Sequence, residues 1–216
     1  MDMSGLRIGP QSAGDGALVQ ARGTREGAEI SSNLGGLYEE SCVRGQLFTH
    51  SLAATSTNIA AGHIVGATAA ANIQFGVFNP VASGKNLVLL EFALGIISGT
   101  FPAGPAFHGL IPNVPTLAAS GTPYSNLMGS GLTSVAKCYS SAAGAALTGA
   151  LAVVTHKLTN FSSTATAQAS PYLVNTVEYI DGKLVIPPGM GWVPLFSGAG
   201  TTCLMGLSLT WREVAL

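Results

Sequence analysis

The side chains that most often perform chemistry are sparse in this 216-residue chain, and their spacing matches no metal-binding pattern. Histidine ligands usually stand in short motifs such as H-E-x-x-H. The four histidines are isolated from one another, at His50, His63, His108 and His156. We therefore predict no metal and no other cofactor. One alternative stays open: a small metal-dependent enzyme whose ligands come together only in the folded chain.

The carboxylates do not define an active site either. Glycoside hydrolysis needs two acids in one cleft. Beyond residue 45 the acids are Glu91, Glu178, Asp181 and Glu213. Asp181-Gly182 is a strong turn signal. We expect Glu91, which stands among Leu and Phe, to point to the outer face of a sheet or to pair with a Lys or Arg, with a functional role as the alternative.

Nucleotide binding and serine catalysis find no support in the motifs. Residues 83–86 (SGKN) resemble the end of a phosphate-binding loop. However, Asn86 replaces the required Ser or Thr, and Asn79 replaces the first glycine. The chain also lacks the G-x-S-x-G motif of serine hydrolases. We predict that the protein is not an enzyme.

The composition is unusually poor in charge. Charged residues make up 9% of the chain and hydrophobic residues 47%, whereas soluble domains carry about 25% charged residues. Either a membrane or other protein chains must therefore cover much of the surface. Residues 138–156 are nearly long enough to span a bilayer, but Ala, Gly, Ser and Thr fill most of them, so we predict no membrane association. The net charge of −1 gives no reason to expect nucleic acid as a partner.

The charges are concentrated at the start of the chain. Residues 1–45 hold more than half of the 9 basic and 10 acidic side chains. Residues 1–36 are rich in glycine and polar residues and show no sustained apolar period, so they should not fold alone. We predict an extended polar arm over residues 1–36, laid across a partner, and a folded domain over residues 37–216. The cysteines, Cys42, Cys138 and Cys203, are too far apart to indicate a disulfide framework, and we expect buried thiols.

Short apolar segments between Gly/Pro turns predict an all-β domain of about eight strands. A short helix followed by a strand is expected in residues 37–48. Residues 73–78 and 86–97 suggest two strands of a hairpin, and Asp181-Gly182 suggests a second hairpin turn. The other expected strands are residues 135–140, 151–158, 175–179, 184–186, 192–196 and 203–214.

Pro187-Pro188-Gly189 interrupts an apolar segment and points to a particular sandwich. Proline cannot donate to a central ladder, and glycine permits a sharp reversal. We therefore expect residues 183–196 to climb one sheet, turn a corner and return in the other. Such corners are typical of jelly rolls, so we predict a jelly-roll-like antiparallel β-sandwich. An ordinary surface loop is the alternative.

The order of features in the C-terminal third resembles the jelly-roll modules of tailed-bacteriophage virion proteins. The order is a turn, LVIPPG, an aromatic strand, Gly198-Ala199-Gly200 and a final LSLTWREV; NPVASGKNLVLLEFALGI is also similar to a segment of phage structural proteins. The resemblance covers about residues 37–216. It implies a non-enzymatic capsid decoration (cement) or head-fibre protein, assembled in the host cytoplasm and retained in the virion. It also implies a homotrimer that binds the major capsid protein or another virion protein through the arm.

An interface is therefore the expected site of function. Its candidate residues are Arg7, Arg22, Arg25, Leu37, Tyr38, Arg44 and Trp192. The alternative is a tail or fibre module that binds a host receptor or glycan. Its candidate aromatic platform is Trp192, Trp211, Tyr172 and Tyr179, although such residues more often fill a core or an interface.

Overall fold

A computed structural model describes residues 38–52, 72–98, 104–112, 121–146, 153–161, 175–196 and 204–216. The chain divides into two compact units, Met1–Glu40 and Ser41–Leu216. The predicted arm, residues 1–36, lies outside the described residues. Apart from residues 38–40, the described residues belong to the second unit.

The described residues are almost entirely β-structure. One short helix, α1 (Glu39–Val43), precedes the first strand, as the sequence predicted. The strands are β1 (Leu47–Leu52), β2 (Asn72–Phe78), β3 (Lys85–Ser98), β4 (Gly104–Pro112), β5 (Tyr124–Ser125), β6 (Lys137–Ala146), β7 (Val153–Phe161), β8 (Asn175–Tyr179), β9 (Val185–Ile186), β10 (Met190–Phe196) and β11 (Leu204–Ala215).

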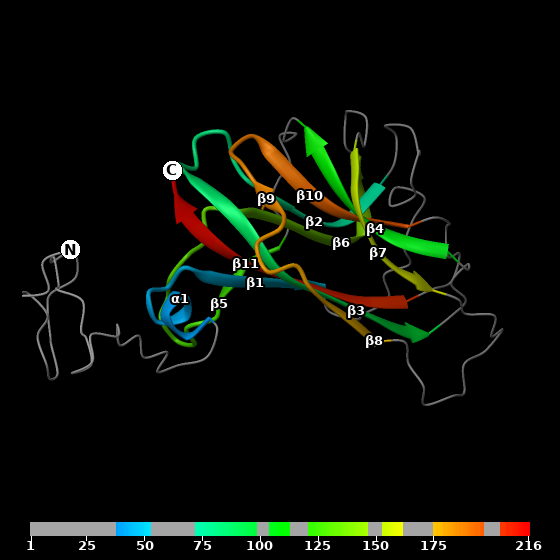
Figure 1. The fold of residues 1–216 in the computed structure, drawn as a ribbon, viewed down its shortest axis with the longest axis horizontal. Coiled ribbons are helices and arrows are strands. Elements are labelled where there is room, and N and C mark those ends of the chain that lie inside the picture. The colour runs from blue at the N-terminus through cyan, green and yellow to red at the C-terminus, as the bar shows by residue number, and fades with distance from the viewer. Residues whose placement is uncertain are drawn as a thin grey trace, which may run out of the picture. The chain divides into compact units, whose positions relative to one another are not determined.

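The strands form two antiparallel sheets that pack into a sandwich (Figure 1). The first sheet has the order β5-β1-β11-β3-β8, with β9 also paired to β3; the second has the order β6-β2-β10-β4-β7. If β5, β6 and β9 are set aside and the remaining eight strands are counted in chain order, one sheet has the order 1-8-3-6 and the other has the order 2-7-4-5. This is the strand order of a jelly roll, so the predicted fold class is confirmed.

The first predicted hairpin is wrong, because β2 and β3 lie in different sheets. β2 pairs with β10 and β6, whereas β3 pairs with β11, β8 and β9. Residues 79–84 therefore cross from one sheet to the other. The alternating pattern identified both strands, but it carries no information about which partner each strand chooses.

The second predicted hairpin is wrong for a different reason. Asp181 and Gly182 do form a turn, with φ values of 49° and 79°, closed by the Lys183 N–H donating to the Ile180 carbonyl at 3.0 Å. However, β8 and β9 both run antiparallel to β3. The turn is thus a local excursion along one edge, and the chain continues in the same direction after it.

The corner at Pro187-Pro188-Gly189 is confirmed. β9 belongs to the first sheet and β10 to the second, so the chain changes sheet at these three residues. The Met190 N–H donates to the Pro187 carbonyl at 3.2 Å, and Gly189 has a φ of 84°, as a type II turn requires. The buried Asn79 side chain joins this corner to the other crossing by donating to the carbonyls of Lys85 and Ile186 at 2.8 and 2.9 Å.

The core lies between the sheets and includes both tryptophans. Trp211 of β11 and Trp192 of β10 are 0% and 2% exposed. Along β3, alternation delivers Leu87, Leu89, Phe92 and Leu94 to this core. The alternation of inward and outward side chains shifts by one residue after Leu89, because the register between β3 and β11 shifts there. A bulge of this kind lets one long strand keep its apolar face inward on both sides of the irregularity.

Candidate functional site

A buried polar cluster joins the two sheets around His108, which is 0% exposed. The Trp192 Nε1–H donates to His108 Nδ1 at 2.9 Å. On the other side of the ring, His108 Nε2 lies 3.3 Å from Glu178 Oε2. Because Nδ1 accepts, the proton of the neutral ring is on Nε2 and faces the carboxylate. Both ring nitrogens are thus engaged, and the cluster ties edge strand β8 to the second sheet.

A second cluster surrounds Glu213 near the end of β11. This carboxylate is 2% exposed and bonds the Lys85 ammonium at 2.8 Å. It also accepts the Ser134 hydroxyl and, at 2.8 Å, the Val135 N–H. Burial, and then the charge of Glu213, raises the pKa of the Cys138 thiol. Lys85, the lysine of the SGKN segment, therefore neutralises a structural carboxylate.

His50 of β1 is a third buried titratable group. Its ring is 2% exposed and stacks on Phe75 at a centroid distance of 5.2 Å. Gly121 lies directly against the ring, where no larger residue would fit. Burial lowers the pKa of His50 below 6.5, although backbone groups of Tyr139 and Thr122 oppose the shift.

The lowered pKa of His50 predicts a loss of stability in mild acid. The unfolded chain gains a proton at this histidine as the pH falls below 6.5, while the folded chain does not. The free energy of unfolding should therefore decrease as the pH is lowered, by up to about 1.4 kcal/mol per pH unit. Replacing His50 with leucine should remove this component. Denaturant unfolding of both proteins at pH 8 and pH 5.5 measures it, and equal losses in the two proteins would contradict the assignment.

The outer face of the first sheet carries a different kind of surface, which we call the hydroxyl face. Cross-strand register defines it as two rows. The first row is Tyr124, Thr49, Thr210, Glu91 and Tyr179, from β5 to β8. The second row is Ser51, Ser208, Ala93 and Val177. Glu91 thus stands on the outer face, as predicted, among small and hydroxyl side chains.

The hydroxyls of this face bond to one another. Thr49 and Thr210 share a hydrogen bond of 2.9 Å, and Ser51 donates to Ser208 at 3.1 Å. Thr49 Oγ1 also lies 2.8 Å from Asn126 Oδ1. Paired hydroxyls cost little to remove from water, because their hydrogen bonds survive burial. A partner can therefore cover the hydroxyls of this face without a large desolvation penalty.

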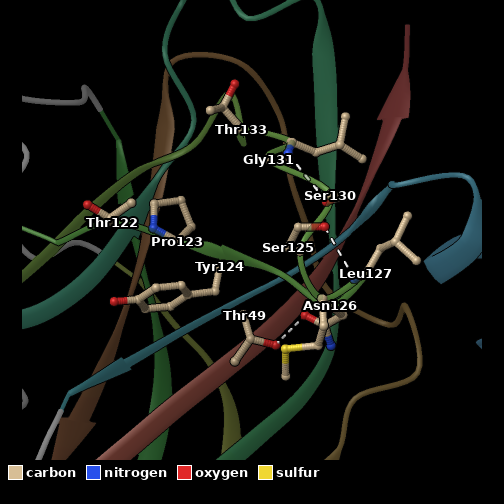
Figure 2. Close-up of a pocket in the computed structure, with 13 residues that line it drawn as sticks. Thr49, Thr122, Pro123, Tyr124, Ser125, Asn126, Leu127, Ser130, Gly131 and Thr133 are labelled. Carbon is tan, nitrogen blue, oxygen red and sulfur yellow. Dashed lines mark hydrogen bonds between the residues drawn. The ribbon is translucent and has the colours of Figure 1, made fainter.

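An open groove of about 630 Å³ continues the hydroxyl face at its β5 end. Figure 2 shows its lining, which consists of Thr49 and residues 122–133. Hydrogen bonds between residues close in sequence support the loop, including that from the Leu127 N–H to Ser125 Oγ at 3.3 Å. Exposed apolar side chains flank the groove: Tyr124 is 70% exposed, Met128 92% and Leu132 45%. The arrangement suits contact with another molecule and offers no titratable pair for catalysis among its lining residues.

Three of the seven predicted interface residues lie in the described part of the chain. Arg7, Arg22, Arg25 and Leu37 lie outside the described residues. Arg44 is exposed after α1, and Tyr38 is half-buried just before it. Trp192 is a correction: it is buried between the sheets and bonded to His108, so it cannot contact a partner at the surface.

The predicted aromatic platform is likewise only partly available. Trp192 and Trp211 are core residues, and Tyr172 lies outside the described residues. Tyr179 is 62% exposed at the edge of the hydroxyl face. Tyr124, its counterpart at the other end, had no signal in the sequence, because its place depends on the pairing of β5 with β1.

Among the described residues, no three His, Cys, Asp or Glu side chains gather as metal ligands would. The helical structure described there contains no segment with the length and hydropathy to cross a bilayer.

Comparison of the chain with protein-family models, with curated proteins and with solved structures finds no match.

Proposed function

We propose that this protein is a non-enzymatic structural component of a phage virion, a capsid decoration (cement) protein that stabilises the shell through protein–protein contacts. The observation that carries the proposal is the hydroxyl face, a sheet surface of hydrogen-bonded hydroxyls on a jelly roll, in which Glu91 is the one charged residue of the two rows. Jelly rolls recur in viral capsid proteins. A subunit that meets neighbours on several sides can be poor in charge, as this chain is at 9%.

The buried ionisable groups support a structural role. His108 engages both ring nitrogens with Trp192 and Glu178, and Glu213 bonds Lys85, Ser134 and Val135. The His108 contacts connect strands of different sheets, whereas Glu213 joins β11 to its neighbour β3 through Lys85 and fixes the loop at residues 134–135. The proposed partners are copies of this chain and the major capsid protein or another virion protein. The proposed location is the virion, after assembly in the host cytoplasm.

A second candidate function is a tail or fibre module that binds a host receptor or glycan. The observation in its favour is the pair of exposed tyrosines, Tyr124 and Tyr179, with the groove beside Tyr124. Aromatic rings offer apolar faces on which sugars stack. Binding on a glycan array that is lost in the Tyr124→Ala and Tyr179→Ala variants would favour this function over decoration.

The docking role of the arm is testable by deletion. Removing residues 1–36 should leave the circular dichroism spectrum and melting temperature of the domain unchanged, because the chain divides near Glu40. The truncated protein should no longer bind virus particles stripped of this chain, whereas the full chain should rebind. Co-sedimentation measures both. Undiminished binding of the truncated protein would refute a docking arm.

A further inference from the structure

We propose that residues 121–126 form an acid-sensitive strap, which crosses from one sheet to the other over His50 and opens when that histidine takes up a proton. This inference does not rest on the proposed assembly function, because it concerns a single copy of the chain. Opening would also take apart the groove, since residues 122–126 line it together with Thr49.

The strap is attached to a different sheet at each end. At its start, the Gly121 N–H donates to the Cys138 carbonyl at 3.1 Å, on edge strand β6 of the second sheet. At its end, β5 pairs with β1 of the first sheet, and the Asn126 N–H donates to the Leu47 carbonyl at 2.9 Å. Figure 2 shows this second end, where Asn126 also bonds to Thr49 of β1.

The strap lies directly against the buried ring of His50. The ring is 2% exposed and stacks on Phe75, and a Cβ atom at Gly121 would overlap its Cε1 and Nε2 atoms. Backbone groups of Tyr139 and Thr122 lie close enough to favour the charged ring. Neither ring nitrogen, however, makes a well-formed hydrogen bond with a described residue. The ring therefore meets water only when a segment that covers it moves.

A proton on His50 favours the open strap. In the closed protein, burial lowers the pKa of the ring more than the backbone groups of Tyr139 and Thr122 raise it. With the strap open, the ring is in water and regains its usual pKa of 6.5. The open form thus binds a proton that the closed form does not. Each pH unit below 6.5 therefore favours opening by up to about tenfold, until the lower pKa of the closed form is reached.

No charged group described around the ring offsets this effect. The ionisable residues of the elements packed against His50 are Tyr124 of the strap, Lys137, Cys138 and Tyr139 of β6, and Arg212 and Glu213 of β11. Tyr124 and Lys137 are exposed, and Tyr139 packs in a separate apolar cluster. Burial raises the pKa of the Cys138 thiol, which stays neutral in acid. Both ionisable residues of β11 are bonded to other side chains.

The strap should open more readily than the rest of the domain, because less holds it in place. β5 pairs with β1 through two residues, whereas β11 pairs with β3 along its whole length. Tyr124 is 70% exposed, so opening uncovers little additional apolar surface there. Segments with few buried contacts open locally at a lower free energy than global unfolding requires.

Hydrogen exchange at pH 7.5 and pH 5.5, expressed as protection factors, tests the strap. Protection of the Gly121 and Asn126 amides should fall up to about tenfold at pH 5.5 in the wild type. It should be the same at the two pH values in His50→Leu. His50→Gln, which keeps a polar but uncharged side chain, serves as a second variant and should behave in the same way.

Low concentrations of urea separate local opening from global unfolding. Protection of the two strap amides should not respond to urea, whereas that of β11 amides should fall, because global unfolding exposes far more surface. Strap amides that share the urea dependence of β11 would overturn the strap. Equal wild-type protection at both pH values, or an equal fall in the two His50 variants, would overturn its control by the histidine. Neither result bears on whether copies of the chain assemble.

Discussion

Replacing Trp192 with alanine is expected to lower the free energy of unfolding by about 3–5 kcal/mol, the usual cost of truncating a buried aromatic side chain. The indole is 2% exposed and packs against Phe75 and Phe92 at centroid distances of 6.2 and 5.1 Å. Its loss opens a cavity at the centre of the sandwich. It also removes the indole N–H that donates to His108 Nδ1. Equilibrium denaturation in urea measures the change.

Trp192→Phe separates packing from hydrogen bonding. This variant keeps an aromatic ring, loses the N–H that donates to His108 and gives up part of the packing volume, so the expected cost is about 1–3 kcal/mol. If Trp192→Phe were as stable as the wild type while Trp192→Ala lost stability, packing alone would account for the loss, and the Trp192–His108 bond would not have the structural role assigned to it.

Replacing Lys85 with methionine is expected to cost about 3 kcal/mol, at the low end for breaking a buried ion pair. The Lys85 side chain is 40% exposed, whereas that of Glu213 is 1% exposed. Removing the lysine therefore leaves a carboxylate that cannot reach water. The Ser134 hydroxyl and the Val135 N–H still bond to it, which limits the loss.

Glu213→Gln should be milder than Lys85→Met. The glutamine oxygen can still accept from the Val135 N–H, and the released Lys85 ammonium can turn to solvent. The double variant should resemble Glu213→Gln alone, because the penalty of Lys85→Met arises from the buried charge. Thermal and urea unfolding of the three variants measure the order. A larger loss for Glu213→Gln than for Lys85→Met would contradict this asymmetry.

The strands and the corner could be predicted from the sequence because their signals are local. Phe75 and Val77 alternate with Gly76 in the period of two that a strand shows, and Pro187-Pro188-Gly189 specifies its own turn. Partner choice is not local. Residues 79–84 have the composition of a hairpin turn, yet Asn79 bonds to Ile186, 107 residues away, and fixes a crossing instead.

The candidate site could not be predicted for the same reason, because it depends on which strands pair with one another. Thr49 and Thr210 are separated by 161 residues, and only the pairing of β1 with β11 places their hydroxyls 2.9 Å apart. A lone threonine in a strand gives no sign of such a row. Trp192 was misassigned to an interface because burial and contact with a partner select the same large aromatic side chains. Glu91 was placed correctly, since a carboxylate amid apolar residues of a buried strand has few places other than the outer face.

The measurement that tests the central claim most directly is the solution mass of the full chain by light scattering at several concentrations. The chain has a mass of 21.8 kDa. If its charge-poor surface serves to bind other copies, the protein should form a defined oligomer; the homotrimer implied by the phage resemblance has three times this mass, about 65 kDa. A monodisperse species of 21.8 kDa at every concentration would contradict self-assembly.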